Sequence, residues 1–449
     1  MDGKIGDTKA TATDTIVALA SGSGPSAIAV VRVSGPETRA VLEALTGGVP
    51  EPRHASLRDI GSPARAPLDR GLALWFPSPA SFTGEDMAEL QLHGSRAIVS
   101  GLIDAVLSLP GTRLAEPGEF VSRAFANGKL DLRQVEGLAD LINAETRCQM
   151  EQALLQTQGF AGARYEDWRQ RLLKSQALVE AELDFADEGD VGAGTAFEAQ
   201  RIVDQLLAEI GEPLKGRGER LRDGVRIVIA GPPNAGKSSL LNALAKRDVA
   251  IVCEEAGTTR DVIEVHLDLG GLPVILTDTA GLREAEGTVE AEGVRRALAR
   301  AGEAELVIWL VDATAPVWLP PHALRTRSGG VIAVLNKIDV APDAEGLQHR
   351  IAISARTGQG MERLIEALHQ AAALATEAGV GSPLMTRARH RVELEGVRDA
   401  LRRFGHQSLS PELKAEELRI AARHLGRLTG RIDVEEVLGA IFAEFCIGK

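Results

Sequence analysis

The apolar positions of the first 125 residues alternate over short distances and are separated by turns rich in Gly and Pro. Runs of this kind predict β-strands, here at 16–20, 27–33, 72–76 and 87–92. Residues 95–109 instead have apolar positions at helical spacing. Strands mixed with a helix predict an N-terminal α+β domain over residues 1–125.

From about residue 124 the apolar period becomes helical, which predicts a first helical part over residues 126–223. Its apolar side chains are expected to form the core of a helix bundle. They are Leu130, Leu132, Val135, Leu138, Leu141, Ile142, Leu154, Leu172, Leu173, Leu178 and Leu183. Acidic residues and glycines at 184–194 predict a break. The glycine- and charge-rich stretch 215–224 resembles a linker.

Residues 224–379 alternate buried strands with helices. The strands are predicted at 225–230, 274–278, 306–311 and 331–335. Such alternation is typical of a parallel sheet with helices on both faces. The chain is helical again over residues 380–449. The fold class is therefore multidomain, α/β plus α, with a helical domain interrupted by an inserted α/β domain.

The composition is that of a soluble globular protein. Lys and Arg number 50 against 63 Asp and Glu, so the formal charge is −13, which disfavours binding nucleic acid through the overall field. Three distant cysteines do not make a disulfide framework. No apolar stretch reaches the roughly 18 residues that a bilayer needs. A cytoplasmic protein with no stable membrane association is expected.

Residues 231–238 carry the strongest chemical signal. They match G-x-x-x-x-G-K-[ST] between a predicted strand and a predicted helix, where backbone N–H groups and the helix N-terminus bind phosphate. Lys237 is expected to reach the β- and γ-phosphates, and Ser238 to ligate Mg²⁺. The candidate nucleotide-binding residues here are Asn234, Ala235, Gly236, Lys237, Ser238 and Ser239.

Three further elements follow in the order of a Ras-like GTPase. Asp278 ends an apolar strand and is placed to hold Mg²⁺ through water. Asp339 follows another strand, and its carboxylate can accept both N–H donors of guanine, which adenine lacks. The candidate residues are Asp278, Thr279, Ala280 and Gly281, then Asn336, Lys337 and Asp339, then Ser354, Ala355 and Arg356.

A switch segment is expected between the P-loop and Asp278. It comprises Cys253, Glu254, Glu255, Ala256, Gly257, Thr258 and Thr259, with Thr259 as a Mg²⁺ ligand. One position departs from the Ras-like pattern. Leu282 stands where those enzymes place a glutamine that orients the attacking water. Another group must orient the water, or hydrolysis is negligible.

Three segments outside the GTPase motifs carry a family resemblance. FTGEDMAELQLHG at 82–94, GEFVSRAFANGKLDL at 118–132 and FCIGK at 445–449 resemble the MnmE (TrmE) family of tRNA modification GTPases. The resemblance implies a folate-binding, dimerising N-terminal domain, a discontinuous helical domain and an inserted GTPase domain. It also implies a homodimer and a heterotetramer with MnmG, an FAD protein. Together they add an aminomethyl-type group to carbon 5 of the wobble uridine of certain tRNAs.

The resemblance also implies a one-carbon cofactor, 5-formyl- or 5,10-methylene-tetrahydrofolate, and its contacts Arg32, Glu89, Lys129 and Lys449. A carboxylate such as Glu89 can pair with a pterin edge, and Arg or Lys suits the glutamate tail. Taken alone, Arg32 and Lys129 are more typical of solvated surface charges.

For hydrolysis, the resemblance implies a K⁺ ion held when two GTPase domains meet. Its ligands are the side chain of Asn234 and backbone carbonyls among Cys253, Glu255 and Thr258. Glu290 matches the family's catalytic glutamate, which orients water through a bridging water. Without the resemblance it would be interpreted as a solvated glutamate.

Several alternatives stay open. A different class of function, a regulatory GTPase switch in ribosome assembly, shares the GTPase motifs but has no use for folate. The basic stretch 387–403 fits either a tRNA contact or a solvated helix face. Which tRNAs are substrates, and whether ammonium or glycine is the nitrogen donor, is not encoded in any motif.

Overall fold

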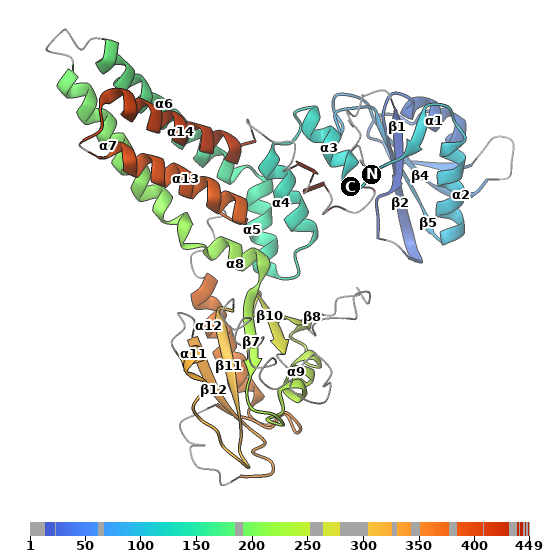
Figure 1. Ribbon diagram of the computed structural model, residues 1–449. Helices are drawn as coiled ribbons and strands as arrows, with labels where there is room; N and C mark the ends of the chain where they lie inside the picture. Colours follow the sequence, from blue (N-terminus) through green and yellow to red (C-terminus); the bar gives the residue numbers. More distant parts are fainter. Residues whose placement is uncertain are drawn as a thin grey trace, which may run out of the picture. The chain divides into compact units, whose positions relative to one another are not determined.

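The computed structural model describes residues 14–22, 24–61, 67–184, 192–251, 264–278, 304–325, 330–342, 351–376, 384–406 and 408–430, and also 438–439, 441–442, 445 and 448 (Figure 1). The chain forms two compact units. The first comprises Met1–Ala139 with Thr429–Lys449, and the second comprises Asp140–Leu428.

A six-stranded sheet is the centre of the first unit (Figure 1). Its order is β3 (Ser56–Ile60), β4 (Asp69–Phe76), β5 (Met87–Gly94), β2 (Ser26–Ser34), β1 (Thr15–Leu19) and β6 (Thr112–Leu114). Helices α1 (Thr38–Thr46) and α2 (Arg96–Leu107) pack on one face, against side chains such as Val17 and Val31. The four predicted strands and the helix near 95–109 are confirmed. β3, β6 and α1 were not predicted.

The other face of this sheet is covered by α3 (Glu119–Ala126), where Phe120 packs on Ile16 and Ala18. The residues near the C-terminus belong to the same unit. Ile441 and Phe445 are buried with the first turns of α4 (Leu132–Ile142). The first unit thus ends at Ala139 and takes up the chain again at Thr429, whereas the domain boundaries expected after residues 125, 223 and 379 stay a prediction.

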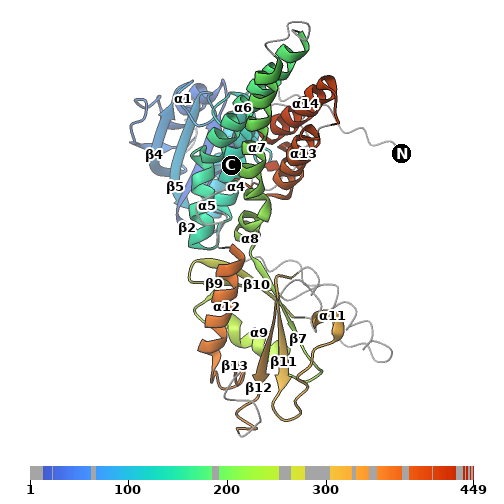
Figure 2. The same cartoon turned by 90° about the vertical axis from the view of Figure 1, so that its left-hand side faces the viewer.

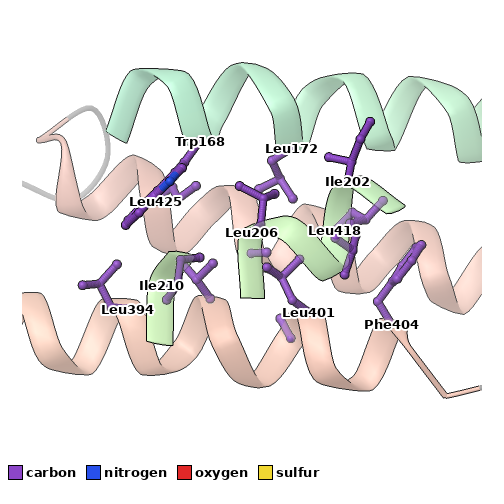
Figure 3. Close-up of a cluster of buried hydrophobic side chains, with 14 of the residues drawn as sticks. Trp168, Leu172, Ile202, Leu206, Ile210, Leu394, Leu401, Phe404, Leu418 and Leu425 are labelled. Carbon is purple, nitrogen blue, oxygen red and sulfur yellow. The ribbon is translucent and has the colours of Figure 1, made fainter. Parts of the chain in front are cut away.

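The second unit contains a helix bundle whose core combines distant segments. It is formed by α6 (Phe160–Asp184), α7 (Gly192–Gly211), α13 (Ala388–Phe404) and α14 (Pro411–Leu428), and α5 (Arg147–Thr157) packs beside it. Figure 3 shows side chains from α6, α7, α13 and α14 meeting in this core. The bundle therefore joins residues on both sides of the inserted domain, as predicted.

Three of the expected core side chains are exposed, and the first of them is Ile142 at 38%. Leu172 is fully buried, but its neighbour Leu173 is 40% exposed, and Leu154 is 43% exposed. The buried face of α6 follows Tyr165, Trp168 and Leu172, a spacing of three to four residues. Leu173 lies one residue, about 100°, off that face.

The predicted linker at 215–224 is also wrong. Residues Arg217–Asp223 form helix α8, which follows a short 3₁₀ turn (η1, Pro213–Lys215) and buries Leu221. Gly216 and Gly224 have left-handed φ values of 75° and 84° and flank the helix. These glycines mark helix ends, where positive φ is required, rather than a flexible connection.

Asp140 joins the chain segments that lead into and out of the inserted domain. Its Oδ1 accepts hydrogen bonds from Arg222 Nε of α8 and from Arg387 Nη2 at the start of α13, both at 2.8 Å. The side chains of Asp140 and Arg387 are each only 9% exposed. A nearby pair, Glu219 with Arg391, links α8 directly to α13.

We expect Asp140→Ala to destabilise the second unit by about 3 kcal/mol, because it removes the carboxylate from two partly desolvated guanidinium groups. Urea denaturation followed by circular dichroism measures the effect. Asp167→Ala is the control, since Asp167 is 49% exposed in its pair with Arg171 and should change stability by less than about 0.5 kcal/mol. Equal stability of the two variants would contradict this role of Asp140.

The inserted domain contains a seven-stranded sheet. Its order is β13 (Ile351–Ala352), β12 (Gly330–Asn336), β11 (Leu306–Asp312), β7 (Val225–Ala230), β10 (Leu272–Asp278), β9 (Glu264–Leu269) and β8 (Ala250–Ile251). The predicted parallel pairing is confirmed from β13 to β10. At the other edge β9 runs antiparallel to both β10 and β8, which was not predicted.

Helices cover both faces of this sheet, as predicted. α9 (Lys237–Ala245) and α12 (Met361–Thr376) share one core with Ile227 and Ile229, whereas α11 (His322–Arg325) lies over the opposite face with Val307. Figure 2 shows α12 and α11 on opposite sides of β7, β11 and β12. Within the described ranges, no helix is long and apolar enough to cross a membrane.

Candidate functional site

The P-loop connects β7 to α9 and has little space around its glycines. A Cβ at Gly231 would lie 2.5 Å from the carbonyl oxygen of Leu310. At Gly236, where φ is 95°, a Cβ would lie 2.4 Å from Asn336 Nδ2. Asn234 also has a positive φ of 61° and an exposed side chain. The loop therefore needs glycine at 231 for close approach, and at 236 for both close approach and backbone conformation.

Lys237 folds back over the loop. Its Nζ donates to the carbonyl oxygens of Gly231 and Pro232, both at 3.1 Å. Burial lowers the pKa of Lys237, and the charge of Asp278 opposes that shift. The ammonium is thus held inside the loop by weak acceptors, which phosphate oxygens can replace with stronger, charge-assisted bonds.

Ser238 and Asp278 meet at the start of α9. Ser238 Oγ donates to Asp278 Oδ2 at 2.6 Å, and Asp278 is only 2% exposed at the end of β10. No cluster of three His, Cys, Asp or Glu side chains suited to a metal is found in the described part of the chain. A hydroxyl beside one carboxylate fits Mg²⁺, which usually binds one or two protein oxygens together with water and substrate phosphates.

Asn336 connects three of the predicted motifs. Its Nδ2 donates to Ala235 O of the P-loop at 2.9 Å, and its Oδ1 accepts from Ala355 N at 3.0 Å. The side chain is only 2% exposed. The two hydrogen bonds hold the P-loop, the segment after β12 and the segment after β13 at one edge of the sheet.

The Asp339 carboxylate is held at both oxygens. Ser354 Oγ donates to Oδ1 at 2.7 Å, and Arg356 Nη2 lies 2.8 Å from Oδ2. The bond from Ser354 is the largest cause that lowers the pKa of Asp339, and Arg356 adds to it. Arg356 is 78% exposed, so its bond to Oδ2 is open to exchange with a planar pair of ligand donors.

The structure therefore brings Lys237, Ser238, Asp278, Asn336 and Asp339 to one site. Several predicted residues lie outside the described residues. They are Cys253, Glu254, Glu255, Ala256, Gly257, Thr258, Thr259, Thr279, Ala280, Gly281, Glu290 and Lys449.

A second constellation lies in the first unit. Arg32 on β2 and Glu89 on β5 are directly opposed in the antiparallel ladder, and Arg32 Nη2 contacts Glu89 Oε1 at 2.8 Å. The Arg32 guanidinium also lies 5.4 Å from the ring centroid of Phe82. Lys129 Nζ donates to Pro79 O at 2.9 Å, in the same 77–86 segment that carries Phe82. Lys129 and Arg32 therefore both contact the 77–86 segment.

Gly448, near the C-terminus, approaches this constellation. Gly448 has a φ of 103°, and a Cβ there would lie 1.9 Å from Leu19 O at the end of β1. The adjacent β1 residue, Ala18, is the register partner of Arg32. Gly448 therefore packs at the end of β1, one strand away from Arg32.

The basic stretch 387–403 is largely used inside the protein. Four of its six arginines contact carboxylates of the second unit: Arg387 with Asp140, Arg391 with Glu219, Arg398 with Asp399 and Arg403 with Glu417. These pairs favour a structural role over a free phosphate-binding face. Sequence reasoning also missed Asp312, which lies 2.6 Å from Lys337 Nζ. Its position at the end of an apolar strand was the available signal.

Comparison with known proteins identifies similar chains. A family model described as "MnmE helical domain" matches residues 132–446, and one described as "GTP-binding protein TrmE N-terminus" matches residues 15–129. The chain is 51% identical to "tRNA modification GTPase MnmE" of Rhodopseudomonas palustris (strain BisB18) over 97% of this chain and 99% of that protein. It is 51% identical to the protein of the same name from Beijerinckia indica, over 97% and 96%.

Among solved structures, the G domain of the T. maritima FeoB iron transporter is 29% identical, over 33% of this chain and 98% of that chain, with a TM-score of 0.26. The FeoB G domain from Methanococcus jannaschii is 25% identical, over 33% and 97%, also with a TM-score of 0.26.

Proposed function

Because the chain belongs to the MnmE family of tRNA modification GTPases, we propose that it uses GTP hydrolysis to drive one-carbon modification of a tRNA wobble uridine together with MnmG. The proposal rests on the observation of two separate groups of polar side chains, one in each unit. The second unit has a nucleotide site built around Lys237, Ser238 and Asp339, and the first unit has Arg32 paired with Glu89.

In the nucleotide site, Lys237 and the N-terminus of α9 bind the phosphates. Ser238 and Asp278 fit Mg²⁺, which supplies charge neutralisation between the β- and γ-phosphates when bound. Asp339 pairs with guanine, and Asn336 holds the P-loop against the base-binding segments. Thr259 is proposed as a further Mg²⁺ ligand. Glu290 orients the attacking water through a bridging water. It thereby takes the role of the glutamine that Ras-like enzymes have at the position of Leu282.

A K⁺ site is proposed beside the P-loop. Asn234 fits this role, because its left-handed backbone presents an exposed side-chain carbonyl at the loop surface. Backbone carbonyls among Cys253, Glu255 and Thr258 complete the ligand set when two GTPase domains meet. A bound cation there offsets negative charge that develops during hydrolysis.

The folate site is proposed around Arg32, Glu89, Lys129 and Lys449. Glu89 offers a carboxylate to the paired donors of a pterin, and the cationic side chains suit the glutamate tail. The pair of Arg32 and Glu89 orients that carboxylate across neighbouring strands. The cofactor is 5-formyl- or 5,10-methylene-tetrahydrofolate, bound in a homodimer.

We expect Glu89→Ala to abolish binding of 5-formyltetrahydrofolate while GTP hydrolysis stays within about twofold of wild type, because the residue and the nucleotide site lie in different units. Isothermal titration calorimetry measures folate binding, and phosphate release measures GTP hydrolysis. Glu43→Ala is the control, an exposed carboxylate of the same unit that pairs with Arg39. Loss of both activities in a folded Glu89→Ala protein would contradict separate sites.

Reconstitution tests the whole proposal. The protein is mixed with MnmG, tRNA, GTP, FAD, NADH, a methylene folate and either ammonium or glycine, and the wobble nucleoside is analysed by mass spectrometry. A modified uridine that requires every component is expected. GTP turnover without any change of the nucleoside would favour a regulatory switch instead. The same reaction with each nitrogen source identifies the donor. We propose that it takes place in the cytoplasm.

A further inference from the structure

Asp312 and Lys337 lie at the ends of two neighbouring parallel strands. Asp312 is the last residue of β11, and its register partner Asn336 is the last residue of β12. Lys337 follows immediately, and its Nζ contacts Asp312 Oδ2 at 2.6 Å. The side chain of Asp312 is 15% exposed and that of Lys337 is 33% exposed, so this ion pair is partly desolvated.

The carboxylate of Asp312 is itself held in one orientation. Its Oδ1 accepts hydrogen bonds from Thr314 N at 2.9 Å and from Thr314 Oγ1 at 2.7 Å. Oδ2 is thereby directed to Lys337. Burial opposes ionisation of Asp312, but the hydrogen bonds from Lys337 and Thr314 outweigh it and lower the pKa of the carboxyl. Lys337 and Thr314 together therefore hold the carboxylate charged and ordered.

Lys337 has a backbone conformation that needs support. Its φ of 68° is left-handed, which a residue with a Cβ adopts at a cost of about 1 kcal/mol or more. The residue stands between Asn336, which is bonded to the P-loop, and Asp339, which is bonded to Ser354. The left-handed turn sets the spacing of these two side chains. A contact that anchors Lys337 therefore also fixes the positions of the Asn336 and Asp339 side chains.

We propose that Asp312 is a positioning residue for guanine nucleotides, which holds Lys337 and, through it, the turn that places Asn336 and Asp339. The inference rests on the nucleotide site proposed above. It adds a residue that reaches the base only through Lys337. An exposed ion pair would do little to hold Lys337 in place. This pair is short and partly buried, and Thr314 holds its carboxylate in one orientation.

The decisive variant is Asp312→Asn, which keeps the shape and the acceptor for Thr314 but removes the charge that binds Lys337. We expect the Kd for a fluorescent GDP analogue and the KM for GTP to rise roughly tenfold, whereas kcat changes less than twofold. Glu362→Gln is the control. Glu362 is exposed, pairs with Arg247 in the same domain and should leave both constants unchanged.

A double-variant cycle tests that Asp312 acts through Lys337. Asp312→Asn combined with Lys337→Met should bind GDP no more weakly than Lys337→Met alone. Thr314→Ala, which releases one bond to Asp312, should weaken GDP binding in the same direction by a smaller factor. Wild-type affinity in a folded Asp312→Asn protein, or losses that add in the double variant, would overturn the proposal. An Asp339→Asn variant with normal GTP affinity would instead contradict the nucleotide site itself.

Discussion

Asp339→Asn is expected to weaken GTP binding roughly a hundredfold and to shift the preference toward xanthosine triphosphate. The carboxylate accepts two N–H donors of guanine at once, and an amide has only one acceptor oxygen to offer. Xanthine replaces the guanine amino group with a carbonyl, which the new amide N–H can meet. The protein already holds both carboxylate oxygens in place, through Ser354 and Arg356.

Competition against a fluorescent GDP analogue measures this preference, with GTP and xanthosine triphosphate titrated separately. Glu362→Gln, whose carboxylate is exposed beside Arg247, serves as the control and should bind GTP like wild type. Unchanged GTP affinity in Asp339→Asn would remove this residue from guanine recognition.

Hydrolysis is expected to be fast in KCl and slow in NaCl at equal ionic strength. Asn234→Ala should lose the response to K⁺, because the P-loop then lacks its side-chain ligand. Glu290→Ala should lower the hydrolysis rate roughly 10²–10⁴-fold while GTP binding and K⁺-induced pairing of GTPase domains persist, because the glutamate acts on the water and not on the nucleotide. Glu290 lies outside the described residues, so its role rests on the family.

Phosphate release in the two salts, together with GTP binding by the same samples, separates these effects. Glu292→Ala is a matched control two residues along the chain. It should hydrolyse GTP at the wild-type rate. A wild-type rate that is equal in KCl and NaCl would exclude the K⁺ mechanism, and a Glu290→Ala rate equal to that of Glu292→Ala would exclude the catalytic role of Glu290.

Local patterns predicted the buried strands well. Val225–Ala230 is apolar except for Arg226, and the structure has β7 at those residues. The P-loop was also predictable, because the motif specifies a glycine wherever the backbone must approach phosphate. Local patterns failed where two different local structures have the same amino-acid composition. Glycines and charges at 215–224 suit a linker and the two ends of α8 equally well.

The sequence by itself determined the strands β7, β10, β11 and β12 of the inserted domain, the nucleotide motifs and the family, since each depends on residues close together in the chain. Only the tertiary structure decided which side chains meet. Arg32 and Glu89 pair because β2 and β5 are in register, Asp140 meets Arg387 across the inserted domain, and Asp312 reaches Lys337 because two parallel strands end together. Such contacts depend on register and packing between distant segments, which no local periodicity encodes.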